Sequence, residues 1–183
     1  SSIVEPPYVV TALEGLTERT LGTLTHITNA VFDADDEAAI EAADAVVIVT
    51  GFDKHDEGEG AFAAGDRETL YLPAGEPELI NAAAALNDRV VVVLEGGGAV
   101  TMAGWLENVQ AVLMAWYPGM EGGHAIADLL YGDVNPSGRL PISFPAALED
   151  MPEFDNISLK VTYDALHGYR YLDKENKQAL FPF

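Results

Sequence analysis

The residues with the clearest chemical potential are carboxylates in a long segment that follows the first strongly apolar run. Glu59 is flanked there by Gly58 and Gly60, and glycine adopts backbone conformations that are closed to other residues. Flanking glycines of this kind can present one carboxylate into a cleft. His55 lies in the same segment and can tune a nearby carboxylate. The alternative is a solvated acidic loop without a catalytic role.

Two neighbouring motifs are better explained by structural roles. Asp66 and Arg67 end the same segment, and an adjacent acid and base usually anchor a loop through hydrogen bonds and ion pairs. Three glycines at 96–98 do not meet the G-x-G-x-x-G fingerprint of dinucleotide binding, and Glu95 before them repels phosphate. We expect a tight turn with close backbone approach at these glycines.

Other side chains carry weaker signals. Trp105, Trp116 and Tyr117 are candidates for stacking on a sugar ring, although aromatic residues at the ends of strands and helices belong more often to the core. The four histidines lack the spacing of metal ligands, so no metal site and no cofactor is expected.

The elements that must position these residues follow from three apolar runs. The runs at 45–50 and 90–94 are continuous and β-branched, as in strands buried on both faces of a parallel sheet, and the run at 109–116 resembles them. Helical patterns alternate with these strands. They are a helix capped by Asp35 that runs to about Ala43, a helix from Pro77 to about Leu86, and a helix over 121–131. This order predicts an open, mostly parallel α/β sheet in a three-layer αβα sandwich.

Less regular segments complete the prediction. A weaker strand is expected at 23–28, a short strand at 140–144, and a late strand or edge segment at 168–172. Because four prolines interrupt 136–152, residues 135–183 are expected to form an irregular segment that wraps the sheet.

Composition narrows the classes of function. The 183 residues include 30 acidic and 9 basic ones, which gives a net charge of −21 and argues against nucleic acid or an anionic membrane surface as partner. The absence of cysteine excludes disulfides, thiolate metal sites and a cysteine nucleophile. The start, which lacks Met, suggests a fragment, and the length predicts a single domain over 1–183.

A set of motifs resembles the C-terminal α/β sandwich domain of glycoside hydrolase family 3, the family of β-glucosidases, exo-β-glucanases and β-xylosidases. The most specific block comprises WYPGMEGG at 116–123, AIAD at 125–128, GDVNPSGRLP at 132–141 and FP at 144–145. Further matches are EG at 59–60, DR at 66–67, GYRY at 168–171 and LFPF at 180–183, with a weaker one, LEGL, at 13–16. The resemblance covers nearly the whole chain.

The resemblance implies a retaining β-glycosidase whose active site lies between two domains. The nucleophilic aspartate belongs to an N-terminal barrel domain that this chain lacks, so the chain alone is expected to be inactive. The general acid/base is carried over to Glu59, with Glu57 as second choice because six residues separate Glu59 from Asp66. The acidic surroundings of Glu59 favour its protonated form. Asp164-Ala165 departs from the Glu-Gly of many members, and no substrate-binding residue is assigned.

The resemblance also sets the expected partners. These are a terminal β-D-glucoside or oligosaccharide, the barrel domain, and a second copy through a sheet edge that the family's missing first strand leaves exposed. Members are secreted or periplasmic by habit, and a cytoplasmic location stays open. Two other classes also stay open: a non-catalytic module that binds carbohydrate or a partner, and a self-contained ligand-binding domain of flavodoxin type.

Overall fold

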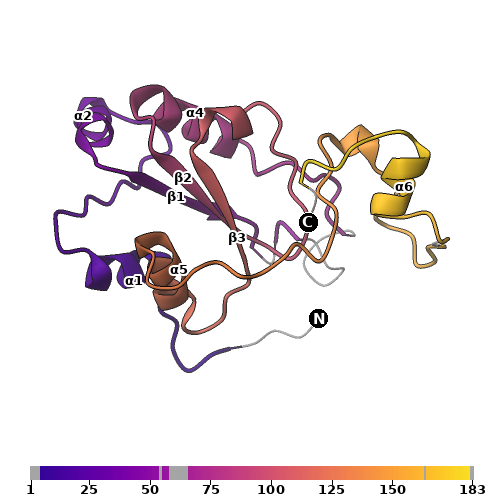
Figure 1. The fold of residues 1–183 in the computed structure, drawn as a ribbon, viewed down its shortest axis with the longest axis horizontal. Coiled ribbons are helices and arrows are strands. Elements are labelled where there is room, and N and C mark those ends of the chain that lie inside the picture. The colour runs from indigo at the N-terminus through magenta and orange to yellow at the C-terminus, as the bar shows by residue number, and fades with distance from the viewer. Residues whose placement is uncertain (1–4, 54, 58–65, 163, 182–183) are drawn as a thin grey trace.

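The structure, a computed structural model, describes residues 5–53, 55–57, 66–162 and 164–181. Three parallel strands form a sheet in the order β1 (Val46–Gly51), β2 (Val90–Glu95) and β3 (Ala111–Trp116). Helices α2 (Ala34–Ala42) and α4 (Glu76–Leu86) cover one face, and α1 (Ala12–Arg19) and α5 (Gly122–Tyr131) cover the other (Figure 1). The predicted three-layer α/β architecture is therefore confirmed.

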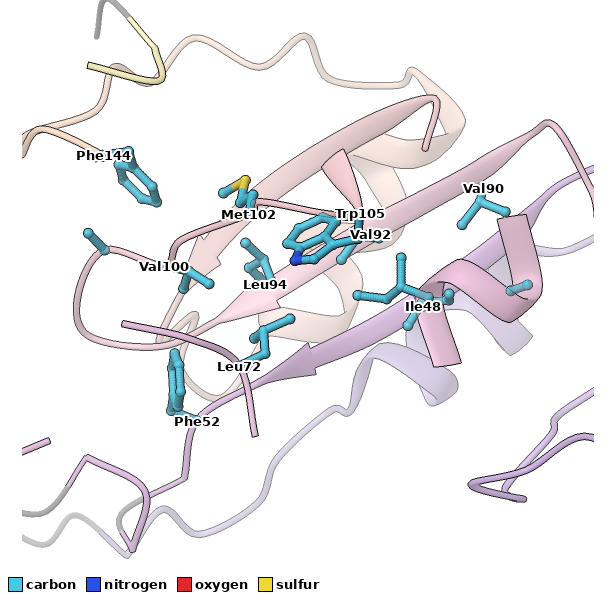
Figure 2. Close-up of a cluster of buried hydrophobic side chains, with 13 residues drawn as sticks. Ile48, Phe52, Leu72, Val90, Val92, Leu94, Val100, Met102, Trp105 and Phe144 are labelled. Carbon is cyan, nitrogen blue, oxygen red and sulfur yellow. The ribbon is translucent and has the colours of Figure 1, made fainter. Parts of the chain in front are cut away.

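The alternation of side chains along the strands divides the core into two halves. On the α4 face, Ile48, Val92 and Leu94 pack with Trp105 in the larger cluster, which Figure 2 shows. On the other face, Val93 packs between α1 and α5. The central strand β2 is thus buried on both sides, as its continuous run of β-branched residues predicts.

Helix α2 begins earlier than the sequence indicated. The cap is Asp33 rather than Asp35, because the Asp33 carboxylate accepts hydrogen bonds from the backbone N–H groups of Asp35 and Asp36. The Asp36 carboxylate accepts a hydrogen bond from the backbone N–H of Asp33, which completes a capping box. Asp35 instead stands in the first turn, where its negative charge suits the helix dipole. The predicted Pro77 helix is confirmed as α4.

The weaker strand predicted at 23–28 is wrong. This part of the described chain has no helix or strand, and most of its side chains are exposed. Its two half-buried apolar residues, Leu24 and Ile27, are three positions apart, so a strand would place them on opposite faces. The third strand is also shorter than predicted, since Val109 and Gln110 precede β3 and a 3₁₀ turn, η1 (Leu106–Asn108), ends just before them.

The two strand predictions near the C-terminus are wrong as well. Residues 140–144 form no strand, and this region contributes an isolated antiparallel bridge between Pro145 and Ala179. The segment predicted as a late strand at 168–172 lies in a short helix, α6 (Tyr169–Lys174), whose anchor is the buried Leu172. A second 3₁₀ turn, η2 (Leu148–Asp150), precedes it, and the rest of the described chain after 135 is irregular.

The layer of α1 and α5 is closely packed. The backbone N–H of Val10 donates to the carbonyl of Met120 at 2.8 Å, and that of Gly123 donates to the carbonyl of Val10 at 2.9 Å. A side chain at Gly123 would collide with the backbone of Thr11, so glycine permits this approach.

Among the described residues, no helix combines the length and apolar character that a membrane span requires.

Candidate active site

The three strands end at the same edge of the sheet, and the loops that leave them meet there. In open α/β sheets, ligands bind at this carboxyl edge. Backbone hydrogen bonds continue the pairing at the strand ends. The N–H of Phe52 donates to the carbonyl of Glu95 at 2.8 Å, and the N–H of Gly96 donates to the carbonyl of Trp116 at 3.1 Å. The three loops are thereby fixed side by side, and each contributes to a polar cluster.

The centre of this cluster is the carboxylate of Glu57, from the loop after β1. Its Oε1 accepts hydrogen bonds of 2.7 Å from the backbone N–H of Gly97, after β2, and of 2.7 Å from the hydroxyl of Tyr117, after β3. The Glu57 side chain is 21% exposed. One oxygen therefore joins all three loops and is already occupied by two donors.

The Arg67 guanidinium lies behind Glu57. Its Nε is 4.0 Å from Oε2 of Glu57, its Nη2 donates to the carbonyl of Ala99 at 2.9 Å, and its carbon Cζ lies 4.0 Å from the centroid of the Phe52 ring. The side chain is 11% exposed. A planar, weakly hydrated guanidinium suits this combination of ring, carbonyl and carboxylate. The structure agrees with the predicted anchoring role of Arg67.

The three consecutive glycines after β2 allow these side chains to approach the backbone. A Cβ at Gly97 would lie 3.1 Å from the Tyr117 ring and 3.3 Å from Oε1 of Glu57, both tighter than ordinary contacts. At Gly98 it would lie 3.0 Å from Nη2 of Arg67, and at Gly96 3.0 Å from the Phe52 ring. The expected close approach is present, and its purpose is to admit Glu57, Tyr117 and Arg67.

Tyr117 differs from the expectation that it belongs to the core. The residue as a whole is 57% exposed, while its hydroxyl is turned toward Glu57. Local burial and the hydrogen bond to Glu57 raise the pKa of this hydroxyl further above the neutral range. Trp116 before it has a positive φ of 57° and packs edge-on against Phe144, which turns the chain out of β3. Trp105 is buried, as predicted.

A compact turn leads from β1 to Glu57. The Asp53 carboxylate accepts bonds from the backbone N–H groups of His55, at 2.6 Å, and Asp56, at 3.1 Å, while its carbonyl accepts from Glu57 at 3.0 Å. These backbone bonds lower the pKa of Asp53, and the charge of His55 adds to them. His55 therefore helps to lower the pKa of Asp53.

The far end of the same loop is held by the C-terminal segment. The Asp66 backbone N–H donates to the carbonyl of Asn156 at 2.8 Å, and Nδ2 of Asn156 donates back to the carbonyl of Asp66 at 3.0 Å. The two flanks of residues 58–65 are thus fixed at Glu57 and Asp66. Glu59 itself lies outside the described residues.

A shallow depression of about 430 Å³ opens beside the cluster, where β1 and β2 end. Asp53, Asp56, Glu76 and Glu95 contribute carboxylates to its lining. Burial raises the pKa of Glu95. Across the described parts of the chain, no group of three or more histidine or acidic residues is arranged to hold a metal ion.

These features define an α/β sandwich domain with a polar cluster at the carboxyl edge of its sheet, and the comparisons identify its family. The chain matches the glycosyl hydrolase family 3 C-terminal domain over residues 1–183. It is 44% identical over 146 residues to the "Probable beta-glucosidase I" of Aspergillus clavatus, which corresponds to 77% of this chain and 17% of that protein. The chain belongs to glycoside hydrolase family 3, as its C-terminal domain.

Solved structures agree with this assignment. The Chaetomium thermophilum β-glucosidase matches 97% of this chain and 23% of its own, with a TM-score of 0.84 and 27% identity. The Bifidobacterium adolescentis family 3 β-glucosidase matches 97% of this chain and 28% of its own, with a TM-score of 0.75 and 32% identity. The chain therefore spans less than a third of the length of these relatives.

Sequence reasoning missed the bond between Glu57 and Tyr117. The two residues belong to different loops, and no spacing in the sequence connects them. The available signal was topological, because both loops follow strands of one parallel sheet.

Proposed function

We propose that this chain supplies the general acid/base of a family 3 retaining β-glycosidase that acts on terminal β-D-glucosyl residues. The proposed residue is Glu59, with Glu57 as the alternative. The observation that carries the proposal is the family membership over the whole chain, together with relatives that bear the name β-glucosidase.

The geometry around residues 58–65 supports this role. Glu57 and Asp66 fix the two flanks at the carboxyl edge of the sheet. Glu59 follows Glu57 by two residues, and two residues of chain reach about 7 Å at most. The last described residue before Glu59 thus lies at the edge where open α/β sheets bind ligands, which supports the proposal. Glu57 suits the acid/base role less well, because its Oε1 is occupied by Gly97 and Tyr117.

The proposed chemistry has two steps. Glu59 donates its proton to the glycosidic oxygen while an aspartate of the barrel domain attacks the anomeric carbon. The glycosidic C–O bond breaks, the aglycone leaves as an alcohol, and a covalent glycosyl-enzyme remains. The Glu59 carboxylate then takes a proton from water as the water attacks the same carbon and releases the aspartate. The two carboxyl groups must lie about 5–5.5 Å apart for this mechanism.

The nucleophile is proposed to come from outside this chain, so the 183-residue chain is expected to be inactive by itself. Loss of a nucleophile costs many orders of magnitude in rate. Turnover of an aryl β-glucoside by this chain, abolished in a Glu59→Gln variant, would overturn this part of the proposal.

The leaving-group dependence of a Glu59→Ala variant of the intact enzyme tests the assignment. A sugar alkoxide needs a proton in order to leave, whereas a dinitrophenolate leaves without one. We expect a loss on the order of 10²–10⁴-fold on cellobiose and a much smaller loss in the glycosylation step on dinitrophenyl β-glucoside. Equal losses on both substrates would show that Glu59 has another role, such as sugar or partner binding.

We also propose that the isolated chain self-associates through a sheet edge. Strands β1 and β3 are the two outer strands of the sheet, and uncovered edges invite pairing. Sedimentation of the purified chain should give a mass above that of one 183-residue chain. A monodisperse monomer would contradict the proposal.

A further inference from the structure

We propose that Glu57 and Tyr117 form a positioning pair for the acid/base, a role that rests on the proposed function of Glu59. The pair is made entirely of described residues and lies where the three strand-end loops meet. Glu57 is the last described residue before 58–65, so its carboxylate fixes the point from which the chain continues to Glu59.

The first argument is how completely this carboxylate is held. Its Oε1 accepts 2.7 Å bonds from the backbone of Gly97 and the hydroxyl of Tyr117, and its Oε2 faces the guanidinium of Arg67 at 4.0 Å. Hydrogen bonds to an ionisable carboxyl group are among the stronger ones in proteins. Donors from the loops after β2 and β3 thus converge on a residue from the loop after β1.

The second argument is that the surrounding sequence makes room for the pair. Glycine at position 97 is needed because a Cβ would crowd both Glu57 and Tyr117, and glycine at 98 admits the Arg67 guanidinium. The Tyr117 hydroxyl is protonated across the neutral range and donates to Glu57 at 2.7 Å. A solvated acidic loop would need none of these adjustments.

The functional consequence is specific to proton transfer. A general acid must lie within hydrogen-bonding distance of the leaving oxygen, and a displacement of about 1 Å costs on the order of 100-fold. Loosening position 57 should therefore slow the steps that need the proton and spare an activated leaving group. A purely structural role would affect both substrates alike.

The test compares variants of the intact enzyme on cellobiose and on dinitrophenyl β-glucoside. Glu57→Ala should lower kcat/KM for cellobiose by on the order of 10–100-fold and change the activated substrate far less. Tyr117→Phe, which removes one hydroxyl, should show the same selectivity at about tenfold. Glu57→Gln retains an acceptor oxygen and should restore most of the activity, whereas a residue that transfers the proton itself tolerates neither replacement.

The matched control is Tyr131→Phe. Its hydroxyl is also partnered, at 2.6 Å from Oγ1 of Thr20, and the residue is 47% exposed, but it lies on α5 away from the cluster. It should leave both substrates unaffected.

The outcomes separate this inference from the proposed function. If Glu59→Ala shows the leaving-group pattern while Tyr117→Phe and Glu57→Ala behave like Tyr131→Phe, the positioning pair is refuted and the acid/base assignment survives. If Glu57→Gln loses as much as Glu57→Ala and Glu59→Ala shows no pattern, Glu57 is itself the acid/base and both proposals fail. If Glu57→Ala does not fold, Tyr117→Phe and Glu57→Gln still decide the question.

Discussion

The hydroxyl of Tyr117 lies 2.7 Å from Oε1 of Glu57, sixty residues earlier in the chain. This bond connects the loop after the third strand with the loop after the first, and the N–H of Gly97 adds the loop after the second. The carboxyl edge of the sheet is therefore organised around one carboxylate. That carboxylate stands two residues before the residue to which we assign proton transfer.

Arg67 should contribute strongly to stability because several groups depend on it. Arg67→Ala would remove the donor to Ala99, the charge beside Glu57 and the contact with Phe52. We expect a loss of about 2–3 kcal/mol in the free energy of unfolding, measured by urea denaturation. The control is Arg89→Ala, at a side chain that is 57% exposed, which should change the free energy of unfolding by less than about 0.5 kcal/mol. Similar losses at both positions would contradict the anchoring role.

Asn87 should be needed for the packing of α2 against α4. Its buried amide donates to the carbonyls of Ile40 at 2.8 Å and Ala43 at 2.9 Å, which end α2. Asn87→Ala removes both of these bonds and should cost about 1–2 kcal/mol in the free energy of unfolding. The Ile40 carbonyl keeps the backbone N–H of Ala43 at 3.3 Å, and the Ala43 carbonyl keeps the Arg89 guanidinium at 3.3 Å. The control Asn29→Ala, at an exposed amide that donates to Asp36, should cost much less. An unchanged urea midpoint for Asn87→Ala would refute this prediction.

His124 should make the stability of the α1–α5 layer depend on pH. Hydrogen bonds to Glu121 and then to Glu18 raise the pKa of this imidazole, and bonds from Tyr8 and His124 lower the pKa of Glu121. The folded protein thus favours the charged imidazole. Its stabilisation is complete below the unfolded pKa of about 6.5 and is lost as the pH rises through the higher folded value.

The comparison of wild type with His124→Gln measures this effect. The difference in free energy of unfolding should be larger at about pH 6 than at about pH 9, and salt should reduce it because the groups are exposed. In a Glu121→Gln background most of the pH dependence of this difference should disappear. A difference that grows toward high pH would contradict the assignment.

Much of the fold was predictable because local signals agreed with the global architecture. The runs at 45–50 and 90–94 became parallel strands, and Pro77 stands near the start of α4. Only β2 is buried on both faces, because Val49 of β1 is exposed. The errors arose where a strand-like pattern had no partner strand in the sheet. Residues 23–28 resemble a strand in composition but find no neighbour in the sheet, and the aromatic GYRY run forms a helix anchored by Leu172.

The site was predictable only in part for the same physical reason. The anchor Arg67 and the close approach at the glycines 96–98 could be predicted from residue type and position, and the assignment of Glu59 stays a prediction. The roles of Tyr117 and Asn156 could not, because each acts through a contact between distant segments that register and loop path decide. The spacing of residues in a sequence indicates contacts within one helix or strand, whereas the contacts of Tyr117 and Asn156 join different segments.

The most direct measurement of the central claim is azide trapping by Glu59→Ala in the intact enzyme. With an activated aryl β-glucoside, the covalent intermediate should still form but wait for a water molecule that no base activates. Azide needs no base, so it should raise turnover and yield β-glucosyl azide, which NMR of the products identifies. No azide product from Glu59→Ala, or the same product from Glu57→Ala instead, would contradict the assignment of Glu59 as the acid/base.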